Sequence, residues 1–193
     1  MLRVVNDSQR IILGIDPGTQ IVGYGVILVD KRATHYVDMG VIDIRKEKDH
    51  FAKLNTIFSE VSLLIERYNP NDLAIEAPFY GNQNPQVMLK LGRAQGAAIA
   101  AAITHNMPIF EYAPRKVKMA ITGRGSATKE QVALMMEKTL GVKFNTKYLD
   151  ASDALAIAMC HFYQLINPLS DVDNSTSWEK FIKNHPDRIK PSK

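Results

Sequence analysis

A chain of 193 residues, 46% of them hydrophobic, is long enough for one domain with a sizeable core, because domains usually hold roughly 100–200 residues. Lysine and arginine outnumber aspartate and glutamate by 24 to 20, which permits a polyanionic partner without requiring one. One cysteine, Cys160, excludes an internal disulfide and a cysteine-based zinc site, and without a signal peptide or an apolar membrane span the chain is expected to be a soluble cytoplasmic protein.

The first part of the chain predicts three strands and a helix. The apolar run at residues 10–16 is typical of a buried strand, and a Pro-Gly turn ends it. Two further strands, at residues 23–29 and 34–44, follow after short connections and indicate an antiparallel meander. Apolar residues then recur at steps of three and four over residues 51–68, which predicts an amphipathic helix.

Strands and helices alternate in the rest of the chain. The expected elements are a strand at 73–76, a loop at 77–85, a helix at 86–105, a strand at 108–112 and helices at 115–122, 128–140 and 150–165. Ser126 is the expected N-cap of the helix at 128–140. This order predicts an α/β fold, a mixed five-stranded sheet with helices on both faces. Residues 1–166 would form this domain, and residues 167–193 a polar C-terminal extension.

Carboxylates end two of the predicted strands. Asp16 closes the first strand, and Glu76 closes the strand at residues 73–76. Ligands of open α/β sheets collect beyond the carboxyl ends of the strands. For either residue alone, the simpler interpretation is a cap of the turn that follows.

Asp150 and Asp153 lie three residues apart at the start of an apolar helix, so they share one face. Acidic residues in a first turn are usually caps, but an interior helix could aim both at the edge where the strand carboxylates end. Four converging carboxylates repel each other unless cations neutralise them. Oxygen ligands without His or Cys suit Mg²⁺ or Mn²⁺, and two such ions can activate water and stabilise a leaving 3′ oxygen. The pattern therefore predicts metal-dependent phosphodiester hydrolysis.

Several motifs resemble those of one known family. Ile-Leu-Gly-Ile-Asp-Pro-Gly-Thr at residues 12–19, with Gly-Tyr-Gly-Val at 23–26, resembles the opening of RuvC-type Holliday-junction resolvases. Segments similar to later family motifs follow in the same order at 74–79, 91–96, 111–118, 123–131 and 150–156. The resemblance covers residues 11–166 and implies an RNase H-like fold.

The same resemblance implies a function. It implies a Mg²⁺-dependent crossover junction endodeoxyribonuclease, a homodimer that cuts opposed strands of a four-way DNA junction symmetrically in recombination and repair. The implied ligands of two metal ions are Asp16, Glu76, Asp150 and Asp153. Some members carry His where this chain has Asp153. A motor complex that migrates the junction is a further implied partner.

Basic residues concentrate on and between the two helices that precede the last one. They are Arg115, Lys116, Lys118, Arg124, Lys129 and Lys138. A run of charge is usually a solvated face, but beside a phosphodiesterase site it becomes a plausible track for DNA phosphates. By resemblance, Lys118 and Lys129 lie near the scissile phosphate, where they position it or stabilise transition-state charge.

Three more residues are assigned to DNA. Arg93 lies in the motif at residues 91–96. Phe79 matches a family residue that stacks on bases where the junction is opened, and Tyr80 either shares that task or packs against the protein.

Some alternatives stay open. Gly92 and Gly96, four residues apart, fit close packing of a helix in the core or a two-fold interface. Asp-Pro-Gly-Thr after a strand also resembles the first phosphate loop of actin-like ATPases and sugar kinases, whose two related domains do not fit into 193 residues. A protein that binds junctions without cutting them is the third possibility; the four acids argue against it, because acids buried without a metal destabilise a fold.

Overall fold

The computed structural model describes residues 9–78, 84–144 and 149–166. The elements are β1 (Gln9–Asp16), β2 (Ile21–Asp30), β3 (Ala33–Asp43), α1 (His50–Tyr68), β4 (Asp72–Glu76), α2 (Pro85–Thr104), β5 (Ile109–Tyr112), α3 (Pro114–Thr122), α4 (Lys129–Leu140) and α5 (Leu149–Ile166). The order agrees with the order predicted from the sequence. The prediction that Ser126 caps α4 is wrong, because Thr128 caps this helix in a reciprocal capping box with Gln131.

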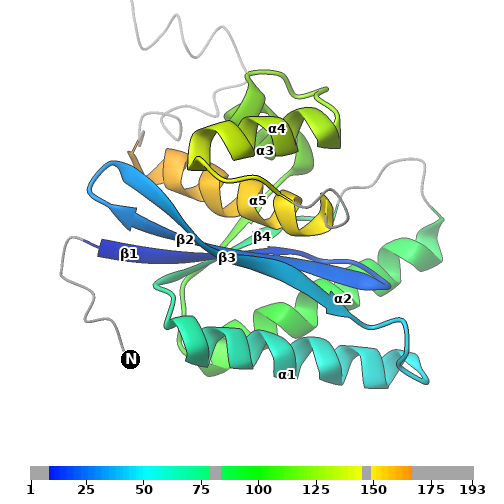
Figure 1. Ribbon diagram of the computed structural model, residues 1–193. Coiled ribbons are helices and arrows are strands. Elements are labelled where there is room, and N and C mark those ends of the chain that lie inside the picture. Colours follow the sequence, from blue (N-terminus) through cyan, green and yellow to red (C-terminus); the bar gives the residue numbers. More distant parts are fainter. Residues whose placement is uncertain (1–8, 79–83, 145–148, 167–193) are drawn as a thin grey trace, which may run out of the picture.

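The five strands form one mixed sheet in the order β3-β2-β1-β4-β5 (Figure 1). β1, β2 and β3 are an antiparallel meander, whereas β4 runs parallel to β1, and β5 parallel to β4. Ile15 of β1 pairs with Ile75 of β4, so Asp16 and Glu76 are the next residues on adjacent strands. The parallel arrangement therefore brings both strand-end carboxylates to the same edge of the sheet, as predicted.

Helices cover both faces of the sheet (Figure 1). α1 and α2 pack on one face, and α5 packs on the other beneath α3 and α4. Each face of the sheet has a hydrophobic core, and β1 contributes side chains to both. Leu13 and Ile15 belong to the core under α1 and α2, whereas Ile12 belongs to the core under α5. No helix in the described ranges is long and apolar enough to cross a membrane.

Glycines let α5 approach the sheet closely. A Cβ atom added to Gly14 would lie 2.1 Å from the carbonyl oxygen of Ala154, and one added to Gly23 would lie 2.1 Å from the carbonyl oxygen of Asp150. Any larger residue would push the helix away from β1 and β2. These two glycines therefore set how far the first turns of α5 stand from the end of β1.

A buried ionic network joins β1, β4 and α5 at the opposite end of the parallel strands. Asp72, at the start of β4, is fully buried and accepts a 2.7 Å hydrogen bond from Nη2 of Arg10. His161 of α5 places its Nε2 3.3 Å from the same carboxylate and its Nδ1 2.7 Å from the hydroxyl of Tyr112. Burial works against the charge of Asp72, but His161 and Arg10 hold its pKa below the usual range. The network has a structural role, far from the strand-end acids.

Candidate active site

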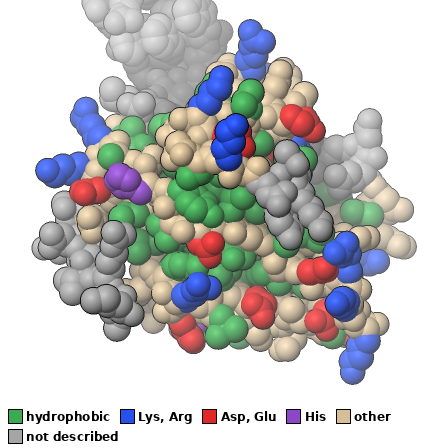
Figure 2. Space-filling model, in the orientation of Figure 1, with side chains coloured by type: hydrophobic (Ala, Val, Ile, Leu, Met, Phe, Trp, Pro, Cys, Tyr) green, Lys and Arg blue, Asp and Glu red, His purple; other side chains and the backbone are tan. Residues whose placement is uncertain are grey.

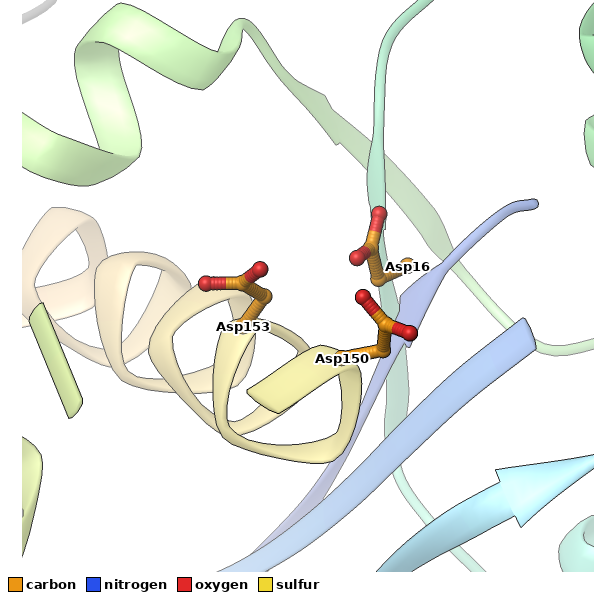
Figure 3. Close-up of side chains that lie close together, drawn as sticks. All are labelled: Asp16, Asp150 and Asp153. Atoms are coloured by element: carbon orange, nitrogen blue, oxygen red, sulfur yellow. The ribbon is translucent and has the colours of Figure 1, made fainter. Parts of the chain in front are cut away.

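Three aspartates meet where β1 ends and α5 begins (Figure 3). One carboxylate oxygen from each of Asp16, Asp150 and Asp153 lies within 4.8 Å of the others. Asp150 and Asp153 project from the same face of α5 toward Asp16, which is the geometry expected from their three-residue spacing. The side chain of Asp153 is 17% exposed and that of Asp150 is 43% exposed, so the group opens to solvent on the side of Asp150.

Glu76 faces the same site from the neighbouring strand. A cavity of about 190 Å³ is lined by Asp16, Glu76, Pro114, Val117, Lys118, Lys129, Val132 and Asp153, and we call it the acidic cavity. Glu76 lies outside the closest group of three oxygens, so the four acids form a trio and a fourth member on the adjacent strand. The lining comes from β1, β4, α3, α4 and α5, which are distant in sequence.

Burial and mutual repulsion raise the pKa values of Asp16, Glu76 and Asp153. The pKa of Asp16 is raised well above its ordinary value, first by burial and then by the charges of Glu76 and Asp153. Burial, followed by the charge of Asp153, raises the pKa of Glu76 to about 7. Burial also raises the pKa of Asp153, although Lys129 opposes the shift. The metal-free cavity thus disfavours its own full ionisation, and divalent cations bound by hard oxygen ligands would remove that penalty.

Lys129 is the cation that partly neutralises the trio. Its Nζ lies 2.5 Å from Oδ2 of Asp153 and 3.3 Å from Oδ1 of Asp150. Burial opposes its charge, but the hydrogen bond with Asp153 raises the pKa of the ammonium above its usual range. Thr128 caps α4 and so holds Lys129 in the first helical turn, beside the start of α5. Lys118 of α3 lines the same cavity.

The other DNA contacts predicted from the sequence do not line the acidic cavity. Lys116 lies with its Nζ 5.4 Å from the ring centre of Tyr112, and Arg115 packs over Gly125. Arg124 lines a separate hollow of about 320 Å³ on α3 and α4, which also includes Lys138. Arg93 is exposed on α2. Figure 2 shows basic side chains over α3 and α4, as a track for phosphates requires. Phe79 and Tyr80 lie outside the described residues.

The sequence did not predict a second group of cations. Lys48, Lys53 and Lys90 line one cavity of about 410 Å³ beside the turn between β1 and β2, and we call it the lysine cavity. They come from the loop before α1, from α1 itself and from α2, so no run of charge marks them in the sequence.

Comparisons with known proteins agree on one family. The family described as "Crossover junction endodeoxyribonuclease RuvC" matches residues 12–161. A relative with that description from Cytophaga hutchinsonii is 53% identical over 183 residues, which cover 94% of this chain and 89% of the relative. Another from Bacteroides fragilis is 50% identical over 185 residues, covering 95% of this chain and 97% of the relative.

Solved structures agree with the sequence relatives. Thermus thermophilus RuvC, in complex with a Holliday junction substrate, is 33% identical, covers 82% of this chain and 96% of that chain, and gives a TM-score of 0.74. The yeast mitochondrial Holliday junction resolvase Ydc2 is 15% identical with a TM-score of 0.62, over 94% of this chain and 86% of that chain. At this low identity, the similarity supports the fold alone. The RNase H-like fold expected from the motifs is thereby confirmed.

Proposed function

The chain belongs to the RuvC family of crossover junction endodeoxyribonucleases, and on this premise we propose that its acidic cavity hydrolyses the phosphodiester bonds of a four-way DNA junction. The protein is a Holliday junction resolvase that acts in recombination and repair. The observation that carries the proposal is the meeting of Asp16, Asp150 and Asp153 at the acidic cavity, which Asp16, Asp153 and Glu76 line. The alternative of a nucleotide-binding fragment loses its support, because the family match continues through the whole series of motifs that the acids come from.

The four acids would hold two Mg²⁺ ions, for which Mn²⁺ can substitute. Asp16, Glu76, Asp150 and Asp153 offer only carboxylate oxygen, the donor type that these ions prefer. The bound ions supply an activated water and a counter-charge for the leaving 3′ oxygen. The protein supplies the walls of the cavity, where Val117 and Val132 limit access of bulk water to the acids.

The two lysines of the cavity would act on the phosphate. Lys118 stands on α3 and Lys129 on α4, so together they can meet a phosphate that enters between the two helices. Lys129 would exchange its contact with Asp153 for the phosphate, and both would stabilise charge that develops on the phosphate oxygens. Arg93, Arg115, Lys116 and Arg124, with Phe79 and Tyr80, remain predicted DNA contacts farther from the scissile bond.

We propose a homodimer formed through α2, because a two-fold enzyme matches the cutting of two opposed strands. Among the described residues, no atom lies within 4 Å of a Cβ added to Gly92 or Gly96, so these glycines do not serve close packing within the protomer. Leu89 and Ile103 are 57% and 61% exposed on the same helix. This face suits a second copy of α2. A junction-migrating motor complex is the further partner we propose.

Two further predictions concern the chain as a whole. We propose that the enzyme works in the cytoplasm, where its DNA substrate is, and that residues 1–166 form the nuclease domain with residues 167–193 as an extension.

A cleavage assay that compares a four-way junction, a linear duplex and a single strand tests this function. With Mg²⁺ the wild type should convert the junction into nicked duplexes and leave the other two DNAs largely intact. The variant Asp16→Asn should bind the junction without cutting it, while Glu60→Gln, which alters an exposed acid on α1, should cut normally. Equal cleavage of all three DNAs would refute junction selectivity. Hydrolysis of nucleotides without DNA would support the nucleotide-binding alternative.

A further inference from the structure

The lysine cavity and the acidic cavity share one turn of the chain. Asp16 ends β1 in the acidic cavity, and Gly18 and Thr19, two and three residues later, line the lysine cavity. The turn has little freedom, because a Cβ atom added to Gly18 would lie 1.8 Å from the carbonyl oxygen of Ile21. The positions of the two cavities relative to each other are therefore set by the tight turn between β1 and β2.

The lysine cavity has the chemistry of an anion site. Lys48 and Lys90 are exposed at its rim, and among the described residues neither they nor Lys53 forms an ion pair. Lys53 donates a 3.2 Å hydrogen bond to the carbonyl oxygen of Thr19, which anchors its ammonium at the turn. Figure 2 shows basic side chains, with acidic ones among them, on the side of the molecule where α1 begins.

The lysines of the cavity outnumber its acidic residues by three to two. Glu47 and Asp49 also line it, but the carboxylate of Asp49 is engaged as the N-cap of α1 and accepts a 2.8 Å hydrogen bond from the amide of Ala52. His50 lines the cavity too, and within the described part of the chain its buried Nε2 has no hydrogen-bond partner. A buried polar atom without a partner is costly, and a rearrangement that let a ligand oxygen reach it would remove that cost.

We propose that the lysine cavity binds a backbone phosphate of the DNA strand whose scissile phosphate lies in the acidic cavity. This inference rests on the proposed function, because its ligand is part of the same substrate. A free phosphate ion offers the same chemistry, but the exposed lysines at the rim and the short chain connection from Asp16 to Gly18 favour a polymer that carries phosphates at both places.

The first test measures the affinity for junction DNA in EDTA, where no cutting occurs. The double variant Lys48→Ala/Lys90→Ala should raise the dissociation constant about tenfold and reduce the salt dependence of binding by roughly one phosphate contact. The matched control is Lys31→Ala/Arg32→Ala, which removes two exposed cations from the hairpin between β2 and β3, at the far end of β2 from the turn that leaves Asp16. Its affinity should stay within about twofold of the wild type. Equal effects in the two variants would overturn the inference.

The second test locates the contact on the DNA. Single methylphosphonates, which remove the charge of one phosphate, are placed at successive positions along the incised strand. At one position near the incision, neutralisation should weaken binding by the wild type but not by Lys48→Ala/Lys90→Ala, the signature of a direct contact. Two results would show that the lysine cavity does not bind DNA. Either Lys48→Ala/Lys90→Ala loses affinity for inorganic phosphate alone, or no methylphosphonate position affects the wild type and the variant differently. A wild type that fails to cut junctions would refute the proposed function itself, a result separate from these.

Discussion

Substitution of Glu76 by glutamine removes one negative charge from the acidic cavity and keeps the size of the side chain. Burial, followed by the charge of Asp153, raises the pKa of Glu76 to about 7, against an ordinary value of 4.5. The pKa of Glu76 is higher in the folded protein than in the unfolded chain. Glu76 therefore destabilises the fold least below pH 4.5, where it is protonated in both states, and this advantage is lost as the pH rises through about 7. At roughly 1.4 kcal/mol for each pH unit, ionised Glu76 costs the metal-free protein at most about 3 kcal/mol at pH 8.

We therefore expect metal-free Glu76→Gln to be more stable than the wild type at pH 8, by up to about 3 kcal/mol, and nearly equal to it at pH 5. Urea unfolding in EDTA at both pH values measures the difference, with Glu60→Gln on the exposed face of α1 as the control for loss of a charge. Mg²⁺ should reverse the order at pH 8, since it stabilises the wild type more. A variant that is no more stable than the wild type at pH 8 would refute the repulsion on which the metal site is argued.

Three further substitutions test other parts of the structure. Lys129→Met should lower the dissociation constant for Mg²⁺ by roughly 3-fold to 10-fold, because the ammonium 2.5 Å from Asp153 no longer competes with the ion. The same substitution should slow single-turnover cleavage by about 100-fold. Weaker Mg²⁺ binding in calorimetry would contradict this expectation. Gly23→Ala should lower the free energy of unfolding by about 1–3 kcal/mol and weaken Mg²⁺ binding, because the added Cβ would lie 2.1 Å from the carbonyl oxygen of Asp150. Unchanged metal affinity would show that the metal site does not need α5 so close to β2. Asp72→Ala should cost about 3–5 kcal/mol in urea unfolding, since Arg10 and His161 lose their buried partner, while the folded fraction keeps its cleavage rate.

Local patterns were enough to predict most of the architecture. The strand of β1 and the turn after Asp16 follow from an apolar run and a Pro-Gly pair, which act over a few residues. Ser126 and Thr128 can both cap α4, but the sequence already distinguishes them, because only Thr128 has a glutamine three residues later, as a capping box requires. The partners of the buried Asp72 were not predicted, since Arg10 lies 62 residues away along the chain.

The sequence by itself determined the order of the elements and the oxygen-only character of the metal site, because periodicity, turn residues and ligand type are properties of short segments. Only the tertiary structure decided the arrangement of the acids: Asp16, Asp150 and Asp153 form a close trio, Glu76 joins them from the adjacent strand, and Lys129 contacts Asp150 and Asp153. It also brought Lys48 and Lys90 from separate segments into one cavity. Distances between residues far apart in the chain depend on packing, here on how closely α5 approaches the glycines of β1 and β2, and no local pattern encodes that approach.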